Sequence, residues 1–228
     1  MSQQYLKWIQ RGASVEVADA VVADPSLITW RDVQGVSALM WAIYSGQTLI
    51  RDYLLFQLAQ AGGSLDVFEA SAVGEAELLE EGLKRSPAHA NALSGDGWTP
   101  LHLAAAFGTP ETVQVLLANG ASVATVSKNA QKNQPLHAAL ALGRNAETVR
   151  LLLEAGADPN ATQTGGYTAL FSAAGANRTD LVELLTAHGA DPSIRNDFGQ
   201  SPAELARERG YSELADRLSI VTAATKPS

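Results

Sequence analysis

Short apolar segments recur along this chain at nearly constant spacing, with polar residues between them. From Leu101 to Leu117, for example, apolar positions follow the period of two short helices. One residue per period ends the first helix, and these residues are Gly12, Gly46, Gly74, Gly108, Gly143, Asn177 and Gly210. Glycine, and next asparagine, favours the left-handed backbone that ends helices. Their regular spacing, shortest between Gly46 and Gly74, therefore predicts stacked helical hairpins.

The clearest unit begins at Asp96 and explains why each period holds two helices. Thr99 is placed to cap a helix start, and Pro100 falls in the first turn, where a missing amide hydrogen costs little. The small pair Ala104-Ala105 allows neighbouring inner helices to approach closely. Leu116-Leu117 fills the space between outer helices. Helices of about ten residues are marginal alone, so we expect stability to come from neighbouring units.

This pattern resembles the ankyrin repeat family, in the style of small bacterial ankyrin proteins. The motif Thr-Pro-Leu-His-x-Ala-Ala, Gly, Val-x-x-Leu-Leu, Gly-Ala is nearly complete from Asp96 to Ala121. Later units depart from it, with Gln134 replacing threonine and Phe171 replacing histidine. The resemblance implies an all-α fold: an ankyrin repeat solenoid of stacked helix-turn-helix units with short β-hairpin loops.

We expect residues 1–222 to form a single domain of about seven units, followed by a mobile tail at 223–228. The units are 1–31 (N-terminal cap), 32–63, 64–93, 94–126, 127–161, 162–194 and 195–222 (C-terminal cap). The unit 64–93 is irregular because it lacks the Thr-Pro-Leu-His start and coincides with the shortest interval, from Gly46 to Gly74. A shortened or missing hairpin there would make the N-terminal part, about residues 1–63, slightly separable.

Composition excludes several classes of function. The 228 residues are 46% hydrophobic, contain no cysteine and carry a net charge of −8. Between Asp52 and Leu83 there are seven acids and no Lys or Arg. The lack of a basic stripe disfavours nucleic acid binding, and no apolar window approaches the ~18 residues of a membrane span. We expect a cytoplasmic monomer with no membrane partner. The acidic stretch is either a solvated helix face or a patch that steers a basic partner.

The histidines do not indicate a catalytic or metal site. His102 and His137 recur at one repeat position, which favours a packing and hydrogen-bonding role. His89 lies in a predicted loop, and His188 lies in a last helical turn, where a cation is favourable. The sequence contains no nucleophile elbow, HExxH motif or phosphate loop. We therefore expect no catalytic residue, no metal and no cofactor.

The resemblance places binding on the concave face, at hairpin tips and the exposed ends of inner helices. The positions so assigned are Tyr44, Asp96, Trp98, Phe107, Asn133, Leu142, Tyr167, Phe198, Gln200 and Arg209. Aromatic residues are only 6% of the chain, yet five of them fall in this row. They either tighten the stack or form a hot-spot row for a partner. The hairpin before Pro135 is slightly longer than others and carries Lys128 and Lys132.

The leading hypothesis is a non-enzymatic scaffold or adapter that binds a protein partner through this face. An inhibitor or immunity-type protein for a basic target is an alternative that the acidic stretch suits. A third hypothesis is an enzyme or small-molecule binder that uses the irregular region 62–91. It rests on three carboxylates there, Asp66, Glu69 and Glu75.

Overall fold

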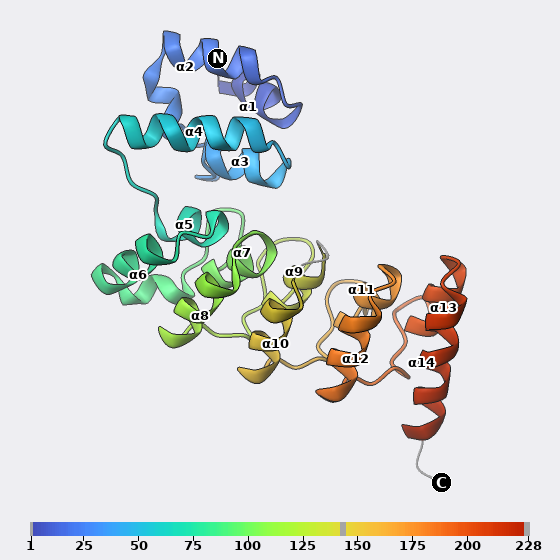
Figure 1. Cartoon of the computed structure of the whole chain (residues 1–228). Coiled ribbons are helices and arrows are strands. Elements are labelled where there is room, and N and C mark those ends of the chain that lie inside the picture. Colours follow the sequence, from blue (N-terminus) through green and yellow to red (C-terminus); the bar gives the residue numbers. More distant parts are fainter. Residues whose placement is uncertain (1, 142–144, 226–228) are drawn as a thin grey trace.

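The computed structural model describes residues 2–141 and 145–225 and is built almost wholly of helices. Within these ranges fourteen α-helices form seven consecutive antiparallel pairs (Figure 1). The α-helices are α1 (Ser2–Gln10), α2 (Ser14–Ala23), α3 (Ala38–Tyr44), α4 (Thr48–Gln60), α5 (Val67–Val73), α6 (Ala76–Arg85), α7 (Pro100–Phe107), α8 (Pro110–Ala118), α9 (Pro135–Ala141), α10 (Ala146–Glu154), α11 (Ala169–Gly175), α12 (Thr179–Ala187), α13 (Pro202–Glu208) and α14 (Ser212–Thr225). Two short 3₁₀ helices, η1 (Pro25–Thr29) and η2 (Pro87–Asn91), precede α3 and α7. The prediction of an all-α solenoid is confirmed.

Side-chain caps set where the inner helices begin. The Thr99 side chain accepts the backbone N–H of His102, and His102 returns a contact to the Thr99 backbone, which completes a capping box at α7. Ser201 and Glu204 form the same box at α13. These reciprocal bonds satisfy amide hydrogens that a helix start would otherwise leave unpaired.

The residues that mark the repeat period do not all end helices in the same way. Gly46 and Asn177 have φ of 67° and 54°, the left-handed backbone that the spacing predicted. Gly108 has φ of −80°, so the prediction of left-handed backbone is wrong at this position. A Cβ at Gly108 would lie 2.3 Å from the Ser71 carbonyl oxygen, so the close approach of two inner helices requires glycine there. Gly143 lies outside the described residues.

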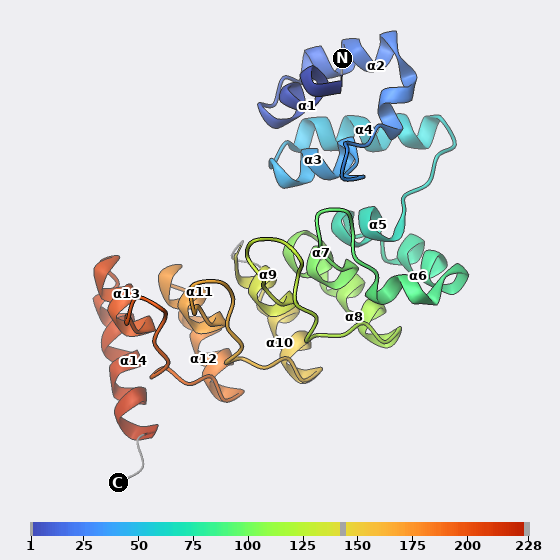
Figure 2. The ribbon, with the colours of Figure 1, turned by 180° about the vertical axis from the view of Figure 1, so that it is seen from behind.

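Hairpin loops precede most inner helices and follow one another along one side of the stack (Figure 2). Backbone hydrogen bonds join successive loops: Lys128 N to Gly97 O at 2.9 Å, Thr164 N to Gln131 O at 2.9 Å, and Asp197 N to Gly165 O at 3.0 Å. The segment between α4 and α5, residues 61–66, has no such hairpin. The short interval predicted that a hairpin would be missing here, and the structure has a plain linker in its place.

The apolar core of the described residues falls into two large clusters and one small one. The first lies within α1–α4 and runs from Tyr5 to Leu54, and the second runs from Val67 to Leu218. A small cluster, with Val36, Met40, Ala72 and Leu103 as its buried members, connects the two blocks, and Leu65 packs against both large clusters. Figure 1 shows α1–α4 as a separate group on α5–α14. We call them the N-terminal block and the main stack.

Among the described residues, no helix is both long enough and apolar enough to cross a bilayer. Helix α14 continues to Thr225, so residues 223–225 are helical where the sequence predicted a tail without periodicity. The remainder of that expected tail, residues 226–228, lies outside the described part.

Candidate functional site

The two repeated histidines are buried and act as internal connectors. In His102, Nδ1 lies 2.7 Å from the Thr99 hydroxyl, and Nε2–H donates to the Asn133 carbonyl oxygen at 3.0 Å. His137 donates to the Ala161 carbonyl at 3.0 Å. Burial lowers the pKa of His102 to about 4 and also lowers the pKa of His137. Each ring thus joins its own helix start to the next loop as a neutral imidazole, which is the structural role that the repeat position predicted.

Three predicted binding aromatics pack against one another at the boundary between the N-terminal block and the main stack. The ring centroids of Trp98 and Phe107 lie 6.2 Å apart and stacked, and those of Tyr44 and Phe107 lie 5.5 Å apart. All three rings are half-buried and belong to the small cluster that connects the blocks. Their packing supports the explanation that these rings tighten the stack.

Other predicted positions differ widely in exposure. The prediction that Asn133 presents its side chain at a tip is wrong, because Asn133 is buried and accepts a hydrogen bond from Ser127. Phe198 is 80% exposed at the last hairpin. Gln200 donates to Glu208 at 2.6 Å. Leu142 lies outside the described residues.

Tyr167 and Arg209 lie in one hollow on the inner-helix layer, between α9, α11 and α13. The hollow measures about 280 Å³. Its other lining residues are Leu140, Ala141, Gln163, Phe171, Ser172, Gly175, Ala176 and Leu205. Ala176, the residue after the end of α11, is small and exposed at the rim of the hollow.

Contacts within the hollow hold its two largest polar side chains in place. The Tyr167 ring packs edge-on against Phe171, with centroids 5.3 Å apart. Arg209 donates from Nη1 to the Gly175 carbonyl oxygen at 2.7 Å, and this bond joins two adjacent units of the stack. Because Phe171 replaces the usual histidine, this unit has an aromatic floor rather than an internal connector. A phenol, a guanidinium and an apolar floor together suit recognition of another protein surface.

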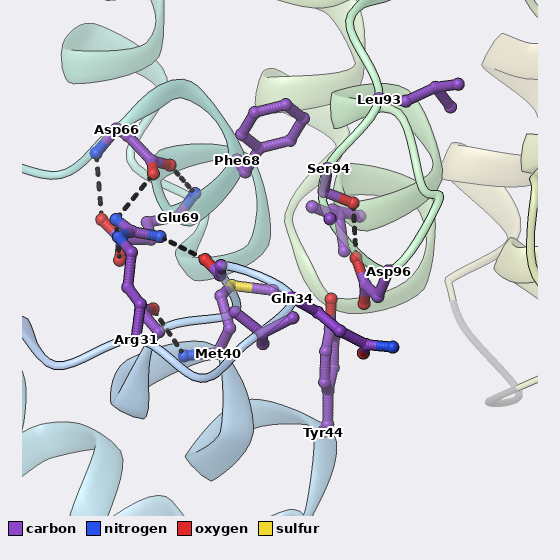
Figure 3. Close-up of a pocket in the computed structure, with 15 residues that line it drawn as sticks. Arg31, Gln34, Met40, Tyr44, Asp66, Phe68, Glu69, Leu93, Ser94 and Asp96 are labelled. Atoms are coloured by element: carbon purple, nitrogen blue, oxygen red, sulfur yellow. Dashed lines mark hydrogen bonds and ion pairs between the residues drawn. The ribbon is translucent and has the colours of Figure 1, made fainter.

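A second cavity, of about 180 Å³, lies at the boundary between the blocks (Figure 3). Loop 31–37, the start of α5 and loop 93–96 surround it. The Tyr44 hydroxyl points to the Asp96 carboxylate across this space. Burial raises the pKa of Tyr44, and the charge of Asp96 and a hydrogen bond to it raise that pKa further. This cavity was not predicted from the sequence, although it lies at the boundary that the short interval between Gly46 and Gly74 indicated.

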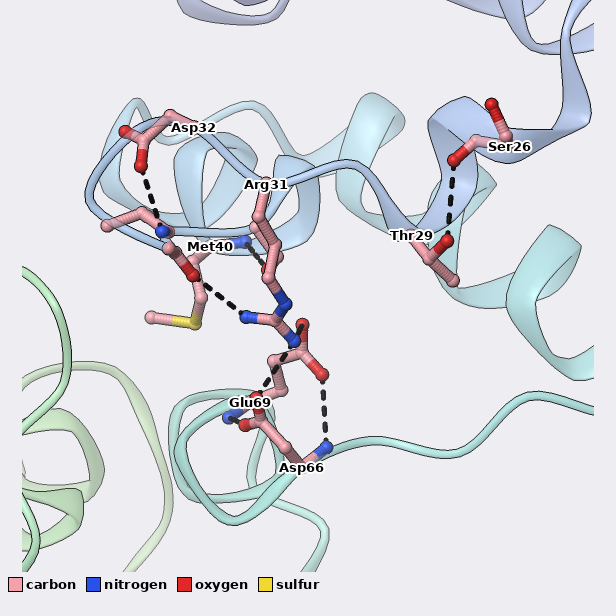
Figure 4. A network of polar contacts seen from close by, with 10 residues as sticks. Ser26, Thr29, Arg31, Asp32, Met40, Asp66 and Glu69 are labelled. Carbon is pink, nitrogen blue, oxygen red and sulfur yellow. Dashed lines mark hydrogen bonds and ion pairs between the residues drawn. The ribbon is translucent and has the colours of Figure 1, made fainter.

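The carboxylates considered for acid-base chemistry are engaged in structural contacts beside this cavity (Figure 4). Asp66 and Glu69 form the capping box of α5. Arg31 Nη2 lies 2.9 Å from Asp66 and 3.2 Å from Glu69, so one guanidinium ties the N-terminal block to α5. Glu75, the third candidate, is exposed at the start of α6.

The described residues contain no group of three or more His, Cys, Asp or Glu side chains that could hold a metal ion.

Comparison with known proteins agrees with the architecture. Models of ankyrin repeats match residues 67–163 and 152–206, which together run from the start of α5 into α13. The ankyrin repeat and SOCS box protein 16 of Mus musculus is 39% identical over 115 residues, 47% of this chain. The E3 ubiquitin-protein ligase KEG of Arabidopsis thaliana is 32% identical over 165 residues, 72% of this chain.

A third relative, the ankyrin repeat domain-containing protein SAT10 of Stachybotrys chartarum, is 26% identical over 219 residues, 90% of this chain. The matched segments make up 25%, 10% and 11% of the three relatives. This chain therefore spans a quarter or less of the length of each of these proteins, and the similarity concerns their repeat regions.

Proposed function

This chain belongs to the ankyrin repeat family, and on that premise we propose that it is a non-catalytic adapter that binds a partner protein through the inner-helix layer. Repeats of this family generally serve as protein-protein interaction modules. The observation that carries the proposal is the hollow between α9, α11 and α13, where Tyr167 and Arg209 converge.

The composition of the hollow supports a protein partner. Tyrosine and arginine are enriched among residues whose truncation costs most binding energy at interfaces. Both side chains are held by contacts, that of Tyr167 with Phe171 of its own unit and that of Arg209 with Gly175 of the preceding unit, so binding would sacrifice little conformational entropy. The neighbouring tip residue Phe198, which is 80% exposed, adds apolar surface at the last hairpin.

A non-catalytic role is supported by the engagement of the titratable side chains. Asp66 and Glu69 bond to each other's backbone and to Arg31, and His102 and His137 bond to internal backbone groups. Catalytic acids and bases must reach a substrate atom, and these groups are committed to the scaffold.

The proposal is tested by affinity capture from cell lysate with the intact chain and with a Tyr167→Ala, Arg209→Ala double variant. Phe56→Ala is the matched control, because Phe56 is a 59% exposed aromatic residue on the outer helix α4. We expect the double variant to lose at least tenfold of the captured partner, while the control retains it. Equal capture by all three proteins, with unchanged circular dichroism, would refute binding through this hollow.

A further inference from the structure

The hairpin missing between α4 and α5 changes how its neighbours meet. Elsewhere in the described part, loops of adjacent units bond to each other, as Lys128 N does to Gly97 O. Here the loop of the second unit reaches the loop of the fourth. A Cβ built on Gly95 would lie 1.5 Å from the Gln34 carbonyl oxygen, so these loops touch and Gly95 must be glycine. The cavity of about 180 Å³ lies beside this contact, lined by both loops and the start of α5 (Figure 3).

The walls of this cavity are apolar and its polar edge is negatively charged. The apolar surface comes from Val36, Met40, Phe68, Leu93 and Leu103. Asp66, Glu69 and Asp96 supply three carboxylates, against one guanidinium from Arg31. The charged side chains that line the cavity thus carry two more negative than positive charges. Asp66 and Glu69 share the single guanidinium of Arg31, whereas Asp96 forms no ion pair with a described residue, so the negative charge at this edge is only partly neutralised.

We infer that this cavity receives the side chain of a single lysine or arginine presented by the partner protein. The inference rests on the proposed function and specifies the chemistry of the partner. A long basic side chain has an apolar stem and a cationic end, which match the apolar walls and the carboxylate edge.

The size and charge of the cavity exclude other occupants. It has room for about six water molecules at ~30 Å³ each, enough for one long side chain. It is smaller than the ~300 Å³ at which drug-sized ligand sites begin. An anionic group would meet three carboxylates, and an uncharged apolar chain would desolvate them without compensation.

A second feature favours a basic partner independently of the cavity. The acidic stretch continues from Asp66 into α6, where four glutamates are exposed: Glu75, Glu77, Glu80 and Glu81. Lys84 pairs with Glu80 at 3.0 Å, and Arg85 shares the last turn of α6, so residues 75–85 keep a net charge of −2. The field of a net negative charge raises the association rate of a basic partner and falls off with salt.

The test uses four short probes, acetyl-Gly-X-Gly-amide with X as arginine, lysine, norleucine or glutamate. They are titrated into the isotope-labelled full chain and followed by NMR at the amides of Gly35, Asp66, Ser94 and Gly95. We expect saturable shifts with the arginine or lysine probe, and no saturation with norleucine or glutamate. Added sodium chloride should weaken the binding.

Two variants localise the effect. Asp96→Asn keeps the shape of the side chain and removes its charge. We expect it to lower the affinity for the basic probe about tenfold. Asp66→Asn should act in the same direction and leaves the Tyr44–Asp96 contact intact. Asp197→Asn, on the exposed last hairpin, is the matched control and should bind as the unmodified chain does. Circular dichroism verifies that each variant is folded.

The inference is overturned if neither basic probe saturates, if norleucine binds equally, or if both charge-removing variants bind like the Asp197→Asn control. Its failure is distinct from failure of the proposed function. If no basic probe enters the cavity, capture that depends on Tyr167 and Arg209 still supports the proposed function. If the Tyr167→Ala, Arg209→Ala variant captures the partner normally, binding of a basic probe still supports the inference about the cavity.

Discussion

The hydroxyl oxygen of Thr99 lies 2.7 Å from Nδ1 of His102, inside the repeat that matches the family pattern most closely. In the unit with Phe171 at the histidine position, the equivalent Thr168 is 1% exposed and its hydroxyl has no hydrogen-bond partner among the described residues. Both threonines precede an inner helix with nearly the same backbone, φ near −87°. The same side chain therefore has opposite energetic roles in two units.

This contrast predicts different effects of one substitution. Thr99→Val should lower the free energy of unfolding by about 1–2 kcal/mol, because it removes a helix cap and a buried bond to His102. Thr168→Val should leave stability unchanged or raise it by up to about 1 kcal/mol, because it removes an unpaired buried hydroxyl. Urea unfolding of the two variants measures the difference, and equal destabilisation would contradict this account.

Acid should destabilise the fold through the buried histidines. Burial lowers the pKa of His102 from its usual 6.5 to about 4, so the folded state keeps the ring neutral while the unfolded state takes up a proton. The stabilising effect is fully present above pH 6.5 and is lost as the pH falls toward 4, by about 3 kcal/mol for His102 at ~1.4 kcal/mol per pH unit. His137 should act in the same direction, because its pKa is lowered too.

Urea unfolding between pH 7.5 and pH 4.5 measures this loss, and His102→Asn should flatten the slope. The hydrogen bond to Arg195 is the main reason why the pKa of Glu204 is lowered to about 2. The stability that this carboxylate contributes is therefore lost below this pH range. A stability that stays constant between pH 7.5 and pH 4.5 would contradict the assignment.

An asparagine that both donates to and accepts from the backbone of the next unit, here called an asparagine clasp, offers a way to stabilise the middle of the stack. Asn160 donates to the Gly189 carbonyl at 2.9 Å and accepts from Asp191 N at 2.8 Å, and Asn91 makes the same pair of bonds to the next unit. The equivalent position between them is Ala124, whose backbone N–H bonds to Ser122 as that of Asn160 bonds to Asp158. Ala124→Asn should complete the series and raise stability by about 1 kcal/mol.

The control for this clasp is Ser193→Asn. Ser193 occupies the same position in the final loop, where its backbone bonds to Asp191, and beyond it the described chain contains only α13 and α14. It should change stability by less than ~0.5 kcal/mol. If both variants behave alike in thermal melts, the clasp does not explain the stability of these junctions.

The N-terminal block should unfold before the main stack. The small cluster around Met40 and Leu103 joins their cores together with Leu65, and cavities of about 180 and 250 Å³ flank this cluster, so the boundary is incompletely packed. Three of the four tryptophans, Trp8, Trp30 and Trp41, lie in this block. Tryptophan fluorescence should therefore change at lower urea than far-ultraviolet circular dichroism. Coincident transitions would contradict the separation into two blocks.

The sequence predicted the helical repeat because its signals are local. Thr99-Pro100 caps, small inner residues and apolar outer pairs each depend on a few neighbouring positions. The missing hairpin was also visible, as the short interval before Gly74. The role of Gly108 was not, because its requirement comes from the distant Ser71 carbonyl and not from its own backbone conformation.

The candidate site was predicted less completely. Tyr167 was predicted at a hairpin tip and Arg209 at the end of an inner helix, both on the concave face, but their convergence in one hollow depends on the spacing of α11 and α13. Asn133 was misplaced because its burial arises from bonds to Ser127 and His102. The cavity beside Asp96 could not be inferred, since it forms between loops that lie far apart in the sequence.

Photo-crosslinking measures whether the hollow on the inner-helix layer binds a partner protein. Benzoylphenylalanine is placed at position 176 in place of Ala176, which is exposed in the hollow, and at position 114 in place of Gln114, which is exposed on the outer helix α8. Irradiation in lysate should yield a discrete protein adduct from position 176 and none from position 114. Adducts from position 114 alone, or the same adducts from both positions, would contradict binding at the hollow.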